Sequence, residues 1–261
     1  MACFVFNNNN KIVFYLYKMA ALFSTSVYRV KNKTPPCSSI NTGASILAYC
    51  IDPQWGDIFF LLGKEKYNRH WQSGSEKWGD FGGSRFQFEL DPETTAAREF
   101  VEETCATVKY FENDSLPRTS SDDIADSLRR GYYTSKFYVS YHSVKQEYFV
   151  VFVKEIPWDP ECVQRFSTVR QLLKSANIFY GTNHWKRAPM QHHPAITINP
   201  NKIRNPILTN KDYLEKIQLS YWSFQQLQYA CEHNGMLRDG EYCRKSFYDF
   251  LHVLISEFIN L

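Results

Sequence analysis

Short apolar runs alternate with polar turn segments from residue 42 onward, and their lengths predict β-strands. Ala44–Ile51 and Ile58–Leu62 are runs of strand length, and the residues between them, 52–57, include Asp, Pro and Gly. Such a segment suits a hairpin connection. Two later apolar runs, Lys136–Tyr141 and Tyr148–Val153, predict further strands. The polar stretch Gly63–Lys77 is expected to be a loop.

Helical spacing replaces this pattern after residue 91. Asp91 followed by Pro92 is typical of a helix start, with an N-cap acceptor and then a proline in the first turn. The expected helix carries an apolar face for packing on the sheet, formed by Ala96, Ala97, Phe100 and Val101.

Near the end of the chain, apolar residues fall at helical spacing and predict a helix with a buried face. That face comprises Phe247, Phe250, Leu251, Leu254, Ile255 and Phe258. Residues 157–212 resemble an insertion, with a helix expected over Cys162–Ala176. The adjacent His192 and His193 would point to opposite faces of an extended chain, so we interpret them as surface or substrate-loop residues, not zinc ligands.

Residues 1–39 differ from the rest, with an Asn run and an apolar patch at 12–27 that Lys18 interrupts. The patch is too short and too broken for a membrane span. Basic residues occur here without any acid before Asp52, which leaves two interpretations open, a poorly ordered extension or a targeting segment. The domain itself is expected to cover residues 40–261.

The composition of the 261 residues, 44% hydrophobic and 22% charged, is that of a globular protein. A net charge of +3 does not by itself imply nucleic-acid binding, so charge leaves the partner open. The seven cysteines are odd in number and widely spaced, which favours reduced thiols in an intracellular, cytoplasmic protein. The oligomeric state stays open.

Three carboxylates share one side of the helix expected after Asp91. Glu99, Glu102 and Glu103 are three and four positions apart or adjacent, so their side chains project within one narrow sector. Like charges in this arrangement repel by a few tenths of a kcal/mol, roughly, per pair. Hard oxygen donors concentrated in this way suit Mg²⁺ or Mn²⁺, which also bind phosphate oxygens. The alternative is a solvated acidic helix face.

The surrounding residues resemble the Nudix box, a pattern that begins Gly, five residues, Glu and ends in Arg-Glu-apolar-any-Glu-Glu-any-Gly. Gly83 and Glu89 match its first half, and the second half is matched by Arg98, Glu99, Phe100, Glu102 and Glu103. The resemblance implies that Glu99, Glu102 and Glu103 bind the metal, that Glu102 or Glu103 acts as a base, and that Arg98 holds Glu89. Gly82, Gly83 and Glu89 would support the site, the glycines by permitting positive φ and a close backbone approach.

Two positions depart from the box. Eight residues instead of seven separate Glu89 from Arg98, an insertion that a loop tolerates. Cys105 stands in place of the final glycine and is followed by Ala106, where a larger apolar residue is usual. If this position is left-handed, a non-glycine residue there costs about 1 kcal/mol.

The resemblance implies an α/β fold, the Nudix α/β/α sandwich with a mixed sheet, and a Mg²⁺- or Mn²⁺-dependent hydrolase. Its substrate would be a nucleoside diphosphate linked to another moiety, cleaved at the pyrophosphate bond. The segment Trp78–Gly83 and the long insertion look similar to Nudix proteins of large DNA viruses, some of which decap RNA, which makes capped RNA an alternative substrate. A Nudix-like module that binds a nucleotide or RNA without cleaving it is the alternative from another class.

Candidate substrate contacts lie on the segments around the box. Arg69 and Trp71 belong to the expected loop, while Trp78 and Phe81 precede the glycines and could stack on a base. Glu147, just before a predicted strand, could contribute a further base or metal ligand.

Overall fold

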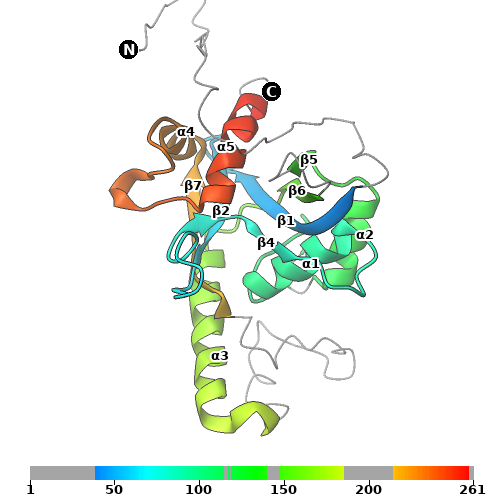
Figure 1. Cartoon of the computed structure of the whole chain (residues 1–261). Coiled ribbons are helices and arrows are strands. Elements are labelled where there is room, and N and C mark those ends of the chain that lie inside the picture. Colours follow the sequence, from blue (N-terminus) through cyan, green and yellow to red (C-terminus); the bar gives the residue numbers. More distant parts are fainter. Residues whose placement is uncertain (1–38, 115–116, 118, 140–146, 185–213, 259–261) are drawn as a thin grey trace, which may run out of the picture.

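The computed structural model describes residues 39–114, 117, 119–139, 147–184 and 214–258, without the side chains of residues 175–184 and 256–258. Within these residues a seven-stranded mixed sheet stands between two layers of helices (Figure 1). The strand order is β3-β2-β1-β6-β5, with β4 paired to β1 and β7 paired to β2.

The strands are β1 (Ile40–Ile51), β2 (Ile58–Glu65), β3 (Trp78–Gly79), β4 (Phe81–Ser84), β5 (Ser135–Val139), β6 (Glu147–Glu155) and β7 (Lys216–Ser223). The helices are α1 (Pro92–Glu103), α2 (Ser121–Arg129), α3 (Cys162–His184), α4 (Phe224–Glu232) and α5 (Lys245–Phe258), with a short 3₁₀ turn, η5, at Arg238–Gly240.

The predicted hairpin is confirmed, because β1 and β2 pair antiparallel up to Ile51 and Ile58. In the turn between them the Asp52 carboxylate accepts a hydrogen bond from the Gln54 N–H at 2.8 Å. The loop expected from Gly63 begins only after Glu65, because β7 pairs with the end of β2 and extends it. This pairing joins residues far apart in sequence, which the local polar pattern could not indicate.

Each face of the sheet has its own hydrophobic core. On one face α1 packs on β1 with α2 against it, and α3 packs beside β7, with Phe100, Leu128 and Phe166 buried in this layer. On the other face α4 and α5 pack on the sheet through Leu227 and Phe250, among others. The predicted α/β/α sandwich with a mixed sheet is therefore confirmed. Of the buried face expected on α5, five positions are buried, and the side chain of Phe258 lies outside the described residues.

Helix α2 is absent from the sequence-based expectations, because only three apolar residues, Ile124, Ala125 and Leu128, mark its buried side. The helix expected over Cys162–Ala176 is present as α3 and continues to His184. Residues 1–38 of the predicted extension lie outside the described residues, as do residues 185–213. Of the helices described, none combines the length and apolarity that crossing a membrane requires.

Candidate active site

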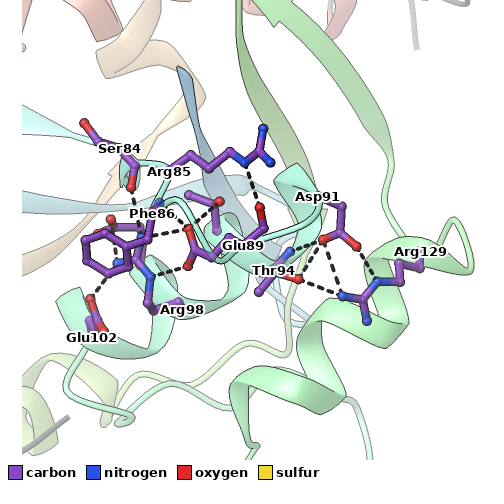
Figure 2. A network of polar contacts seen from close by, with 11 residues as sticks. Ser84, Arg85, Phe86, Glu89, Asp91, Thr94, Arg98, Glu102 and Arg129 are labelled. Carbon is purple, nitrogen blue, oxygen red and sulfur yellow. Dashed lines mark hydrogen bonds and ion pairs between the residues drawn. The ribbon is translucent and has the colours of Figure 1, made fainter. Parts of the chain in front are cut away.

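Helix α1 begins as the sequence predicts. The Asp91 carboxylate accepts a hydrogen bond from the Thr94 N–H at 2.7 Å, and Pro92 occupies the first turn. Arg129 of α2 donates to Asp91 at 2.9 Å, which ties the second helix to this cap (Figure 2). The N-terminus of the helix that carries the carboxylates is thus fixed from two directions.

The end of α1 explains the position where the box has a glycine. Cys105 and Ala106 both adopt left-handed backbone conformations, with φ of 52° and 51°. The Ala106 N–H donates to the Val101 carbonyl at 2.8 Å and the Cys105 N–H to the Glu102 carbonyl at 3.0 Å. The helix therefore closes with the backbone that a glycine favours, at a conformational cost of about 1 kcal/mol per left-handed non-glycine residue.

Gly82 and Gly83 are needed because they lack a Cβ atom where other residues lie close to the backbone, and not because they adopt a positive φ. Both lie in strand β4, which pairs with β1 through Gly82 and Ser45 and through Gly83 and Ala44. A Cβ added at Gly83 would come within 2.3 Å of the Glu99 Oε1 atom, and one at Gly82 within 2.2 Å of the Ser45 Cβ atom. Bare backbone at these positions lets α1 bring its carboxylates against the strand.

Arg98 is the centre of the ion-pair network on the open side of α1 (Figure 2). Its Nε donates to Glu89 at 2.6 Å, and its Nη1 donates to Glu99 at 2.8 Å and to Glu102 at 2.9 Å. A further bond from Nη2 reaches the Ser84 carbonyl at 3.0 Å. The Arg98 guanidinium thus bonds to three carboxylates and to the end of β4. It can do so because its planar group carries five N–H donors in a fixed geometry.

Glu89 is buried, with 2% exposure, and has several donors. Besides Arg98 it accepts hydrogen bonds from the Phe86 N–H and the Thr95 hydroxyl, each at 2.8 Å. Burial by itself raises the pKa of Glu89, but the bonds from Arg98, Phe86 and Thr95 outweigh it and hold the pKa below its ordinary value. Glu89 therefore stays ionised and anchors the loop that leads into α1.

Glu103 lies on the buried side of α1, with 3% exposure. One carboxylate oxygen accepts the Gly82 N–H at 2.7 Å, and the other lies 3.1 Å from the Lys216 Nζ. Lys216 is fully buried and also donates to Glu65 and, at 3.3 Å, to the Asp80 carbonyl. Its stem passes over Gly63, where a Cβ would meet the Lys216 Cδ at 2.8 Å.

Arg244 completes this buried cluster, which we define as Glu65, Asp80, Glu103, Lys216 and Arg244. Its Nη1 donates to Glu65 at 3.0 Å and its Nη2 to Asp80 at 2.6 Å. Burial lowers the pKa of Lys216, but Glu103 and Glu65 outweigh it, so the pKa is raised and the ammonium keeps its charge. Burial raises the pKa of Glu103, and Glu65 adds to the effect against the attraction of Lys216.

Glu99 and Glu102 face a cavity of about 900 Å³. The Glu102 side chain is 17% exposed and that of Glu99 is 11% exposed. Burial raises the pKa of Glu99 to about 7, against the Arg98 charge that lowers it, and repulsion from Glu102 adds to the rise. The cavity is also lined by Glu65, Trp71, Asp80, Gly82, Gly83, Ser84, Phe86, Phe88, Arg98, Glu103, Phe149, Val151, Glu215, Arg244, Ser246, Phe247 and Phe250.

The donor atoms around the cavity fit a hard divalent cation. Carboxylates outnumber cations in its lining, six (Glu65, Asp80, Glu99, Glu102, Glu103 and Glu215) against two (Arg98 and Arg244), with Lys216 behind them. Burial is the main cause of the raised pKa of Glu99, and repulsion from Glu102 adds to it. Arg98 and Lys216 hold the box carboxylates, and among the described residues no three acidic, histidine or cysteine side chains stand in ligating geometry.

The structure corrects two of the expected substrate contacts. Phe81 has no exposed surface and packs edge-on against Phe100 in the core, and Trp78 is 2% exposed against Trp222. Neither ring has a free face for a base, because each lies on a strand whose side chains point into a core. Trp71, by contrast, lines the cavity and is 40% exposed.

The other two expected contacts are not part of the cavity lining among the described residues. Arg69 lies on the exposed loop before β3 and donates to the neighbouring His70 at 2.9 Å. Glu147 begins β6, opposite Ile40 of β1.

Four charged residues of the site escaped the sequence analysis, and none is near the others in the chain. Glu65 ends β2, Asp80 separates β3 from β4, Lys216 begins β7, and Arg244 precedes α5. Only the pairing of β2 with β7, in which Glu65 lies opposite Lys216, brings the first and third together. A single Lys at the start of a strand, such as Lys216 in β7, gives no sign in the sequence that its side chain is buried.

The chain was compared with known proteins in three ways. A scan of family models finds no match, and a search of the curated proteins finds none. Solved structures similar to the chain include a Nudix hydrolase from M. smegmatis, RenU, with 12% identity and a TM-score of 0.41 over 85% of this chain and 87% of that one.

Two further similar structures are a C. elegans Ap4A hydrolase and the NUDIX domain of Shewanella oneidensis NrtR, complexed with ADP ribose. The first shares 16% identity over 46% of this chain and 68% of that one, with a TM-score of 0.27. The second shares 9% identity over 87% and 94% of the two chains, with a TM-score of 0.39.

Proposed function

We propose that the chain is a Nudix hydrolase that depends on Mg²⁺ or Mn²⁺ and cleaves the pyrophosphate bond of a nucleoside diphosphate linked to another moiety. One observation carries the proposal. Arg98 joins Glu89, Glu99 and Glu102 by ion pairs, and Glu103 lines the same cavity as Arg98, Glu99 and Glu102.

Glu99, Glu102 and Glu103 would hold the divalent ion. Once bound, such an ion polarises phosphoryl oxygens and lowers the pKa of a coordinated water. Binding requires Arg98 to give up its contacts to Glu99 and Glu102, while its bond to Glu89 keeps it beside the site. The excess of carboxylates in the lining supports this exchange, because a cation relieves their repulsion.

Glu102 and Glu103 have different roles in this proposal. Glu103 is fixed by the Gly82 N–H and by Lys216, which suits a ligand of constant position. Glu102 faces the cavity, which suits the proton acceptor. Water oxygen attacks a phosphorus, the bridging P–O bond breaks, the Glu102 carboxylate takes the proton from the water, and the other phosphate leaves. Retention of all three carboxylates supports a hydrolase over a module that only binds nucleotides.

Glu102→Gln tests the proposal. The variant removes the proton acceptor and a ligand without disturbing the buried cluster, so we expect metal-dependent turnover to fall by about 10²-fold or more with an unchanged circular dichroism spectrum. Glu232→Gln, on the exposed surface of α4, is the matched control and should retain full turnover.

The assay screens capped RNA, dinucleoside polyphosphates, ADP-ribose, dinucleotide cofactors and inositol pyrophosphates with Mg²⁺ or Mn²⁺. Equal turnover by pure Glu102→Gln and wild-type protein would refute the proposal. Glu103→Gln is a weaker test, because it also removes a charge that faces the buried Lys216.

A further inference from the structure

Two exposed phenylalanines stand at the mouth of the cavity, in the loop that joins β4 to α1. Phe86 is 45% exposed and Phe88 is 76% exposed, and both line the same cavity as Glu99 and Glu102. Their ring centroids are 5.4 Å apart with an interplanar angle of 31°. Neighbouring aromatics left this exposed beside charged groups indicate a surface that is covered when a ligand binds.

The position of Phe86 is set by the ion-pair network. Its ring lies over the Arg98 guanidinium, with 4.0 Å between the Cζ atom and the ring centroid (Figure 2). Its N–H donates to the Glu89 carboxylate at 2.8 Å. Phe86 is thus held from both backbone and side chain, and it supports the more exposed ring of Phe88 beside it.

We infer that Phe86 and Phe88 form a stacking platform for the nucleobase of the substrate, an inference that rests on the proposed function. A nucleotide joins a planar ring to a phosphate chain, and this cavity places aromatic faces beside carboxylates that suit a metal and its phosphate. Stacking on an aromatic side chain is a general way to bind a base. A phosphoanhydride without a base, such as an inositol pyrophosphate, would leave the platform unused.

The test measures binding separately from hydrolysis. The probes are α,β-methylene-ADP and methylenediphosphonate, which share the non-hydrolysable diphosphate and differ by the nucleoside. Each is titrated with Mg²⁺ into the full chain by calorimetry. Phe88→Ala should weaken α,β-methylene-ADP by about 5- to 100-fold and leave methylenediphosphonate within about twofold. Phe88→Leu should behave like Phe88→Ala, and Phe88→Trp should retain binding.

Trp55→Ala, which removes a 72% exposed aromatic from the turn between β1 and β2, is the control and should change neither affinity. Trp71→Ala tests the other exposed aromatic side chain of the cavity, which could stack on the base in place of Phe88. If it alone weakens the nucleotide analogue, the platform is elsewhere and the inference is wrong. Equal weakening of both probes by Phe88→Ala would also overturn it, since Phe88 would then act only on the loop.

Two outcomes separate this inference from the proposed function. If wild-type protein binds both probes and Phe88→Ala changes neither, the platform is refuted and the hydrolase proposal stands. If wild-type protein binds neither probe with Mg²⁺, the proposed function fails and the platform fails with it. Sedimentation completes the test, because a dimer that Phe88→Ala dissociates without affecting either probe would make these rings a contact between copies of the chain.

Discussion

Glu102 and Glu103 are neighbours on helix α1, yet their carboxylates have opposite surroundings. Glu103 is 3% exposed and bonded to Lys216 and to the Gly82 N–H. Glu102 opens on the cavity and shares the Arg98 guanidinium with Glu99. One side of the helix therefore holds a fixed set of buried charges, and the other holds charges that can change partners.

Because of this difference, substitutions on the two sides of α1 are expected to differ in how strongly they affect the stability of the fold and the proposed reaction. Removing one partner of a buried ion pair leaves an uncompensated charge and costs about 3–5 kcal/mol, whereas an exposed pair contributes about 0–1 kcal/mol. Substitutions of the other buried-cluster residues should therefore mainly change unfolding, and those on the open side should mainly change metal binding and turnover, while Glu103, which belongs to the cluster and to the proposed metal site, should affect both.

The largest effect is expected from Lys216→Met. Glu65 and Glu103 lose their shared cation in a buried site, so the free energy of unfolding should fall by about 3–5 kcal/mol. Urea unfolding measures this change. Lys245→Met, whose side chain is 60% exposed in its pair with Asp249, is the control and should cost no more than about 1 kcal/mol.

A second variant sharpens this prediction. Adding Glu103→Gln to Lys216→Met removes the carboxylate that has lost its cation, while Glu65 keeps its bond from Arg244, and should recover part of the lost stability. A loss for Lys216→Met as small as that for Lys245→Met would mean that the buried cluster contributes nothing to the fold.

The next largest change in the free energy of unfolding is expected from Mg²⁺ binding to the carboxylates on the open side of α1. A ligand that binds only the folded state adds about 2.7 kcal/mol at one hundred times its Kd, because unfolding separates the carboxylates. Thermal unfolding with increasing Mg²⁺ should show a rising Tm that EDTA reverses, with a smaller rise in Glu102→Gln. If KCl of equal ionic strength gives the same rise, the effect is screening and the metal assignment is wrong.

Glu89 should make stability depend on acid pH. Its pKa lies below the ordinary value of 4.5 in the folded state, so its contribution is present above that pH and is lost as the pH falls through the folded-state pKa. Glu89→Gln should cost about 2 kcal/mol at pH 7, and the difference from wild type should shrink towards pH 3. Urea unfolding at both pH values checks this, and a pH-independent difference would contradict it.

The smallest change concerns the end of α1 beyond Glu103. Ala106 is exposed and has a φ of 51°, so Ala106→Gly relieves left-handed strain without removing a buried contact. We expect a gain of about 0.5 kcal/mol, since the added freedom of the unfolded chain offsets part of the relief. A loss of stability in thermal unfolding would contradict this prediction.

The structure follows the sequence patterns most closely where neighbouring residues decide the local conformation. The hairpin between β1 and β2, the Asp91 cap and helix α1 were all predicted, because turn residues, capping groups and helical periodicity act over a few positions. The expectation of stacking rings was wrong for Trp78 and Phe81. Trp78 is buried by elements much later in the chain, and Phe81 packs against Phe100 of α1, a tertiary contact that the local pattern does not show. Helix α2 was missed because its short apolar stripe is weak on its own.

The sequence by itself determined that Glu99, Glu102 and Glu103 share one sector of a helix, because the 3.6-residue period places them there. Only the tertiary structure decided which of them is buried. Pairing of β7 with β2 places Lys216 opposite Glu65, 151 residues away, and beneath Glu103. Because side chains alternate along a strand, a slip of one residue would turn Lys216 to the other face. Register between distant strands, which no local pattern encodes, thus sets the difference between the two neighbouring carboxylates.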